Sequence, residues 1–311
     1  MDTQVRLTLR TPPTLPVEAE VLNPENVTGK GPSEIESLPL LVGNRTERAG
    51  DYFDVDVATG EPADPGPGDD GLASLFLAGD LSRFKRLGER MTAGRMVVQG
   101  PVGFHAGAYM SGGSLTLLSD AGDYLGAHMR GGRIEVLGSA GHFAGAAYRG
   151  YTRGMTGGTI LIHGDAGQMP GARMRRGLVA VRGRCADGPG FGMRAGTVLV
   201  CGLSGVRAGA VMVRGTVILL TRPPELLPTF RYNCAYRPPM WPLLLGSLLS
   251  AGFGLEGIGP NALFERYSGD FNEGGKGEIL VYRDGSRSGR FPEAQSGLHN
   301  IFPLAPDRYK I

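Results

Sequence analysis

The chain has few of the residues that build disulfide frameworks or metal centres. Its 311 residues include three cysteines, Cys185, Cys201 and Cys234, and none is spaced as Cys-x-x-Cys. An odd count without that spacing argues against a disulfide framework and against a zinc or iron–sulfur site. Four of the five histidines occupy four different positions of the repeat described below, so they do not converge as metal ligands. We therefore expect no metal bound by this chain.

Long apolar runs are also missing. Residues 241–255 form the longest one, and a proline and three glycines interrupt it, so it is too short to span a bilayer. The N-terminus has neither the basic start nor the apolar segment of a secretory signal. The formal net charge is +2, which does not point to nucleic-acid binding. These absences predict a cytoplasmic protein without membrane or nucleic-acid partners.

Motifs of nucleophilic or nucleotide chemistry are absent as well. There is no Gly-x-Ser-x-Gly elbow and no P-loop, since the run at 274–277 lacks the Lys-Ser/Thr pair. Acting alone on an acidic polymer would require paired carboxylates, and the best candidates are Asp120 with Asp123 or with Glu135. These residues share no position of the repeat. We therefore predict no catalytic residue in this chain.

Glycine, by contrast, is abundant and regularly placed. One series comprises Gly94, Gly113, Gly132, Gly158, Gly177, Gly196 and Gly215. Five of its six steps are 19 residues long, and the exception of 26 residues carries an apparent insertion at 150–156. A second series comprises Gly107, Gly126, Gly145, Gly171, Gly190 and Gly209, and a third position holds Met110, Met129, Tyr148, Met174, Met193 and Met212. Such agreement indicates one small unit stacked many times.

Each copy begins with a short alternating apolar run, such as 115–117, 134–136 or 198–200. Runs of this kind are typical of short strands, and the rest of each copy contains too much glycine for a helix. Same-sense strands that recur without intervening helices predict an all-β fold, a right-handed parallel β-helix (solenoid) of about seven turns. The methionine/tyrosine position and the aliphatic positions are expected to stack inside as its core.

The flanks are irregular. We predict an N-terminal flank at 1–73 with short strands and a Pro/Gly loop, the glycine-repeat β-helix at 74–220, and a capping and partner-docking segment at 221–311. The apolar stretch 240–255 is expected either to cap the solenoid or to dock a partner. Residues 261–267 are expected to form a short helix, and residues 274–282 a turn followed by a strand.

The repeat is rich in arginine. Between Arg95 and Gly215 there are 13 arginines, no lysine and five acidic residues. Four arginines directly follow the methionine/tyrosine position: Arg130, Arg149, Arg175 and Arg194. Stacked about 4.8 Å apart, they would repel one another without counter-charges. They form either a solvated or internally paired face, or a site for carboxylates of a partner surface or of a polyanionic ligand.

The Met-Arg-x-Gly corners at 129–132, 174–177 and 193–196 resemble the glycine-motif β-helix domain found in the large glutamate synthase subunit and as the C subunit of formylmethanofuran dehydrogenase. The flanking runs at 43–45, 53–55, 267–270 and 275–281 resemble the C subunit specifically. Close relatives of that subunit occur in the formyltransferase/hydrolase complex of aerobic methylotrophs. The resemblance covers most of the chain.

This resemblance implies a non-catalytic scaffold in one-carbon metabolism. In the complex, a formyl group passes from formyl-tetrahydromethanopterin to a methanofuran-type carrier with a glutamate-rich tail and is released as formate. The resemblance implies amidohydrolase-like and formyltransferase-like partner chains, with the metal in a partner subunit and no cofactor bound by this chain. The C subunit of a tungsten or molybdenum formylmethanofuran dehydrogenase is the alternative, and a stand-alone carbohydrate-active β-helix enzyme is a second.

Overall fold

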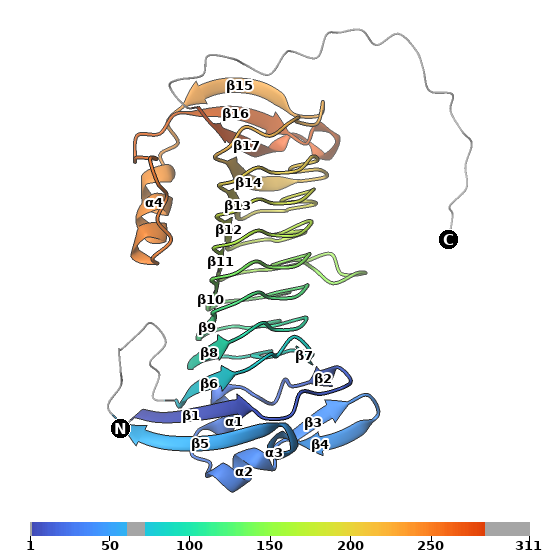
Figure 1. The fold of residues 1–311 in the computed structure, drawn as a ribbon. Helices are drawn as coiled ribbons and strands as arrows, with labels where there is room; N and C mark the ends of the chain where they lie inside the picture. Colours follow the sequence, from blue (N-terminus) through green and yellow to red (C-terminus); the bar gives the residue numbers. More distant parts are fainter. Residues whose placement is uncertain (1, 61–71, 284–311) are drawn as a thin grey trace, which may run out of the picture.

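The computed structural model describes residues 2–60 and 72–283 (Figure 1). Most of the expected Pro/Gly loop, at 61–71, and the end of the expected C-terminal segment, at 284–311, lie outside the described residues. The described chain is mostly β-structure, as the repeat predicts, and successive copies of the repeat stack along the length of the molecule (Figure 1).

The strands are β1 Asp2–Leu9, β2 Val17–Glu18, β3 Pro39–Val42, β4 Arg45–Arg48, β5 Phe53–Gly60, β6 Ser74–Ala78, β7 Phe84–Lys85, β8 Arg95–Gln99, β9 Ser114–Leu117, β10 Arg133–Val136, β11 Thr159–Ile162, β12 Leu178–Val181, β13 Thr197–Val200, β14 Arg214–Leu219, β15 Arg231–Tyr236, β16 Phe264–Gly269 and β17 Lys276–Tyr282. The helices are α1 Pro24–Val27, α2 Pro32–Glu36, α3 Ala49–Tyr52, α4 Trp241–Ser250 and the 3₁₀ turn η1 Phe271–Glu273.

One sheet runs the length of the molecule. It has 13 strands in the order β15-β16-β17-β14-β13-β12-β11-β10-β9-β8-β6-β1-β5, and a smaller sheet has the order β4-β3-β2-β7. From β1 through β6, β8–β14 and β17 the pairing is parallel. Antiparallel strands finish both ends, with β5 against β1, and β16 and β15 beyond β17.

The pairing follows the sequence repeat. Leu115 of β9 pairs with Ile134 of β10, and Ile134 pairs with Ile160 of β11, so equivalent apolar positions lie side by side across the 26-residue step. Their side chains are fully buried. A second ladder of isolated parallel bridges joins the other side of each copy: Leu81, Val102, Ala121, Ala140, Ala166, Cys185 and Ser204. Each copy therefore contributes one strand to the sheet and one bridge to this ladder.

The methionine core differs from the sequence prediction at one position. Met91, Met110, Met129, Met155, Met174, Met193 and Met212 are all fully buried. Met155, and not Tyr148, takes the place between Met129 and Met174. Its N–H donates to Gly145 O at 3.0 Å, and the next residue, Thr156, donates to Met129 O at 2.7 Å. The inserted residues are therefore 148–154, and the prediction that Tyr148 lies in the core is wrong. A buried phenol would require a hydrogen-bond partner that a thioether does not need.

The corners require glycine for two reasons: the backbone has a positive φ, and a Cβ atom would collide with the neighbouring copy of the repeat. Gly177 has φ +97°, and a Cβ there would lie 2.6 Å from Gly158 O and 2.6 Å from Met155 Cε. Both contacts come from the copy below. The glycine spacing therefore reflects how closely one copy of the repeat sits on the next.

The C-terminal flank completes the sheet and covers its other face. Residues 261–267 do not form the expected helix, because they enter β16, which is hydrogen-bonded to β15 and β17. Helix α4 packs Trp241, Leu245 and Leu248 against a second apolar cluster on the sheet, formed by Leu161, Ala180, Leu199, Ile218 and Leu280. Segment 240–255 is thus largely a cover for its own sheet, although Leu243 and Leu249 stay 77% and 55% exposed. Among the described residues, no helix has the length and apolarity needed to cross a membrane.

Candidate functional site

The arginines singled out in the sequence lie at one corner of the stacked repeats. The residue after each core methionine donates its N–H to the methionine carbonyl of the preceding copy: Arg130 to Met110 at 2.7 Å, Arg175 to Met155 at 2.8 Å and Arg194 to Met174 at 2.8 Å. Thr156 occupies the equivalent position between Arg130 and Arg175. The three arginine side chains are exposed. We call Arg130, Arg175 and Arg194 the arginine corner.

Arg149 does not belong to this corner. It lies in the insertion loop, residues 148–154, which projects from the wall between β10 and β11 (Figure 1). The predicted column of four arginines in successive copies is therefore wrong in its register, because the insertion begins before Arg149 and shifts it out of the stack. Arg149 and Arg153 are exposed in the loop, and Arg173 is exposed at its base.

These arginines have few counter-charges. Within residues 2–60 and 72–283, no carboxylate lies within 4.0 Å of Arg130, Arg149, Arg153, Arg175 or Arg194. Two exposed guanidinium groups about 5 Å apart repel by on the order of 1 kcal/mol in water. Internal pairing is thus not what these residues adopt, which leaves a solvated face or a surface that binds carboxylates or other anions.

Beside the arginine corner lies a group of aromatic rings that the sequence analysis did not identify. It comprises His105, Tyr109, Tyr124, His128, Phe143, Tyr148 and Tyr151, and we call it the aromatic patch. His105 stacks on Tyr124 with ring centroids 5.5 Å apart, and Tyr109 stacks on His128 at 5.0 Å. These pairs are 19 residues apart in the sequence, so the signal was present. Histidine and tyrosine alternate at these positions, so neither residue type repeats by itself at the 19-residue interval.

The residues that carry these stacked rings share a left-handed backbone conformation. His105, Tyr124 and Phe143 have φ of 67°, 61° and 65°, and Tyr109 and His128 have φ of 58° and 56°. Non-glycine residues with positive φ are uncommon, and these recur copy after copy. The corner geometry therefore turns equivalent side chains outward in register, so they stack on the surface instead of entering the core.

Burial keeps the patch uncharged. Desolvation lowers the pKa of both His105 and His128, with neighbouring Arg86 and Arg130 adding to the effect, respectively. The pKa of Tyr148 is raised, mainly by burial. At one end of the patch lies Glu89, whose side chain is 4% exposed and is held by Arg86 at 3.1 Å. Desolvation raises the pKa of Glu89.

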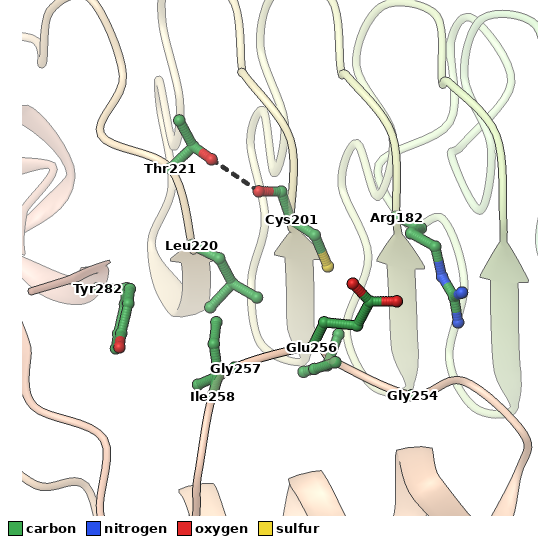
Figure 2. Close-up of a pocket in the computed structure, with 10 residues that line it drawn as sticks. Arg182, Cys201, Leu220, Thr221, Gly254, Glu256, Gly257, Ile258 and Tyr282 are labelled. Atoms are coloured by element: carbon green, nitrogen blue, oxygen red, sulfur yellow. Dashed lines mark hydrogen bonds between the residues drawn. The ribbon is translucent and has the colours of Figure 1, made fainter. Parts of the chain in front are cut away.

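A separate cleft lies between the sheet and the segment after α4 (Figure 2). Its volume is about 550 Å³, and Arg182, Cys201, Leu220, Thr221 and Tyr282 line it opposite residues 254–258. The Arg182 guanidinium lies 4.8 Å from the centre of the Phe253 ring. Burial raises the pKa of Cys201 to about 12, so its thiol stays protonated and is a poor nucleophile near neutral pH.

The carboxylates considered for catalysis hold the repeats together instead. Four aspartates accept backbone N–H groups of the next copy: Asp120 from Ser139, Asp123 from His142, Asp165 from Arg184 and Asp187 from Val206. Glu135 contacts Arg133 at 2.7 Å and His163 Nε2 at 2.9 Å. No group of three or more metal-ligating side chains occurs in the part of the chain that the structure describes. The five acidic residues of the repeat thus have structural partners.

No protein-family model matches the chain. Among curated proteins, it is 38% identical over 105 residues to the C subunit of tungsten-containing formylmethanofuran dehydrogenase 2 from Methanothermobacter wolfeii, covering 34% of this chain and 36% of that protein. It is 32% identical over 89 residues to the C subunit of molybdenum-containing formylmethanofuran dehydrogenase 1 from Methanosarcina barkeri, covering 29% and 27%. These matches span about a third of the curated relatives.

A solved structure extends the likeness to most of the chain. A chain of the formyltransferase/hydrolase complex (FhcABCD) from Methylorubrum extorquens, crystallised with methylofuran, is 33% identical with a TM-score of 0.79. The match covers 90% of this chain and 100% of that one. The chain belongs to the family of formylmethanofuran dehydrogenase C subunits. The resemblance seen in the Met-Arg-x-Gly corners and the flanks is thereby confirmed.

For this member of the C-subunit family, the candidate surfaces are therefore the arginine corner, the insertion loop with the aromatic patch, and the cleft beside α4. The lining of the cleft includes the Cys201 thiol and the Glu256 carboxylate, but the raised pKa of that thiol makes it a poor nucleophile. All three are suited to binding, and the first two lie on the same side of the stacked repeats.

Proposed function

We propose that this chain is a structural, non-catalytic subunit of a formyltransferase/hydrolase complex. The observation that carries the proposal is the match along the full length of a chain of such a complex, at 33% identity and a TM-score of 0.79. The acidic residues of the repeat support it, because the backbone hydrogen bonds of the four aspartates and the contact of Glu135 with His163 join neighbouring copies. In this role the long sheet serves as a rigid support for other chains.

We also infer that the repeats wind as a right-handed parallel β-helix over about residues 74–220. The parallel sheet and the parallel bridge ladder support this, since both advance by one copy at each step. Residues 1–73 then form an N-terminal flank and residues 221–311 a C-terminal cap with docking surfaces. A right-handed course is the rule for parallel strands joined by crossovers.

The complex would move a formyl group from formyl-tetrahydromethanopterin, through a methanofuran-type carrier, to formate, in the cytoplasm. The chemistry and its metal would belong to amidohydrolase-like and formyltransferase-like chains. Methylofuran, named with the similar complex, supports the carrier class. The arginine corner would contact carboxylates, either of a partner chain or of a polyglutamyl carrier, because its guanidinium groups lack carboxylate partners among the described residues.

A second candidate is the C subunit of a tungsten or molybdenum formylmethanofuran dehydrogenase. The curated relatives with that name favour it, at 38% and 32% identity over about a third of their length. Its partner chains would include one that binds a tungstopterin or molybdopterin. The two candidates therefore differ in the partner subunits of the complex and not in the residues of this chain.

Affinity purification of the tagged chain from its host, followed by mass spectrometry and a formyl-transfer assay, distinguishes the candidates. We expect formyltransferase-like and amidohydrolase-like chains in a stable complex that releases formate. Co-purification of a pterin-metal subunit would replace the first candidate with the second. Recovery of the chain alone, with activity on a glycan, would overturn both.

A further inference from the structure

The insertion loop is the one departure from the 19-residue step between Gly94 and Gly215. It projects beyond the neighbouring corners of the repeat (Figure 1). Residues 149–153, which read Arg-Gly-Tyr-Thr-Arg, are all exposed, and the Tyr151 ring is 57% exposed. A large aromatic side chain on the projection thus stays more than half exposed, although one edge of it packs against the His128 ring with centroids 5.0 Å apart.

The loop is nevertheless held firmly at its base. The Tyr148 N–H donates to His128 Nε2 at 2.9 Å, and Arg173 Nη1 donates to Tyr151 O at 2.7 Å. The Gly154 N–H donates to Arg173 O at 2.8 Å. The Tyr148 ring packs within 4.9–5.9 Å of the rings of His105, Tyr109, Tyr124 and His128. Because these contacts already order the projection, it would lose little further conformational entropy on binding a partner.

The charged side chains of the loop itself have one sign. Arg149 and Arg153 flank Tyr151, Arg130 and Arg173 lie near its base, and residues 136–164 contain no acidic side chain. Tyrosine and arginine are the side chains most often found at the energetic centres of protein interfaces. A convex projection cannot enclose a small ligand, which needs a concave site. It can enter a recess in another protein, and charge complementarity would require that recess to be acidic.

We propose that the insertion loop is a docking finger, which enters an acidic recess of a partner protein chain and contacts it through the exposed part of Tyr151, flanked by Arg149 and Arg153. The rings of His105, Tyr109, Tyr124 and His128 pack against Tyr148 and Tyr151 and hold the finger in this conformation. The identity of that chain rests on the proposed function, under which it is the formyltransferase-like or the amidohydrolase-like subunit. The finger thereby gives the stacked repeats a defined side for assembly.

The test measures the affinity of the purified full-length chain for each purified partner subunit. The variants are R149Q/R153Q and Y151A, which leave the backbone hydrogen bonds of the loop in place. The control is R184Q, since Arg184 is exposed next to the bridge ladder at Cys185, away from the loop. We expect each loop variant to weaken binding of one partner by at least about 10-fold, with little change for R184Q. The R149Q/R153Q variant is also expected to bind with a weaker salt dependence.

Three results would count against the finger. If the wild-type chain binds a partner and both loop variants bind it equally well, the finger is overturned and the proposed function stands. If the wild-type chain binds neither partner, the proposed function fails and the finger falls with it. If R149Q/R153Q loses affinity for a poly-L-glutamate peptide but not for the partner subunits, the loop binds a polyanion and the finger is again overturned.

Discussion

The backbone N–H of Tyr148 donates a hydrogen bond to Nε2 of His128, from the preceding copy of the repeat, at 2.9 Å. The two rings are also in contact, with centroids 4.9 Å apart. The backbone of Arg153, at the other end of the insertion loop, partly offsets the lowering of the pKa of His128. His128 must be neutral to accept at Nε2, and its buried position favours that form.

His128→Phe should loosen the insertion loop without abolishing the fold. Phenylalanine keeps the stacking on Tyr109 but cannot accept from the Tyr148 N–H, and a partly buried N–H left without an acceptor costs about 1–3 kcal/mol. We expect faster hydrogen exchange across residues 148–154 and unchanged exchange in β12 and β13. Phe143→Leu, another patch residue that accepts no hydrogen bond from the loop, is the matched control. Unchanged exchange in the His128→Phe loop would mean that the ring contacts alone hold it.

Acidification should weaken the same attachment. The pKa of His128 lies below its usual 6.5 in the folded chain, because burial and the neighbouring Arg130 oppose its positive charge. The unfolded chain therefore binds the proton more readily, and this stability is present above about pH 6.5 and lost as the pH falls below it. We expect the melting temperature to drop between pH 7.5 and 5.5, and to drop less in His128→Phe. His105, whose pKa is lowered in the same direction, should account for part of the remaining slope.

Two glycines with similar backbone angles should differ sharply in their tolerance of alanine. Gly177 (φ +97°) has a carbonyl oxygen 2.6 Å from where a Cβ would lie, whereas Gly150 (φ +86°) has nothing within 4 Å. Both substitutions incur the left-handed backbone cost of about 1–2 kcal/mol, and Gly177→Ala adds the overlap, about 1–3 kcal/mol more. Urea denaturation of both variants measures the difference. Equal losses would show that the copies can separate locally to admit a methyl group.

Helix α4 should contribute to stability through one face only. Trp241 is 1% exposed and packs on Phe264, whereas Leu243 on the same helix is 77% exposed. Trp241→Ala is expected to destabilise the chain by about 3–5 kcal/mol, and Leu243→Ala to leave the melting temperature within about one degree. Comparable losses at both positions would mean that Leu243 is buried in solution, for example against a second chain.

The two most buried thiols should resist alkylation. Burial raises the pKa of Cys185 and of Cys201 to about 12, so at pH 8 the thiolate form is a very small fraction. We expect iodoacetamide to label both residues slowly in the native chain and completely after denaturation, as read by peptide mass spectrometry. Rapid native labelling of Cys201 would show that the cleft beside α4 supports an ionised thiol.

Individual residues show how much of the structure the sequence pattern predicted correctly. The 19-residue spacing correctly aligned Leu115 with Ile134, and it did so across the 26-residue step to Ile160, because each copy must bury the same face. It misplaced the insertion by two residues, since Tyr148 and Met155 both fit a coarse apolar pattern and only packing distinguishes a phenol from a thioether. The helix expected at 261–267 failed for a similar reason, because pairing with β15 and β17 outweighs local preference.

The primary structure by itself determined the parallel strand order, the apolar core and all but one position of the methionine core, since these follow from one short unit repeated at a constant interval. It also identified the arginines and the family. Only the tertiary structure decided which arginines share a corner, that histidine and tyrosine rings stack beside them, and that the insertion loop stands out from the wall. Those outcomes depend on side-chain direction at left-handed corners and on contacts between copies, which spacing along the chain does not specify.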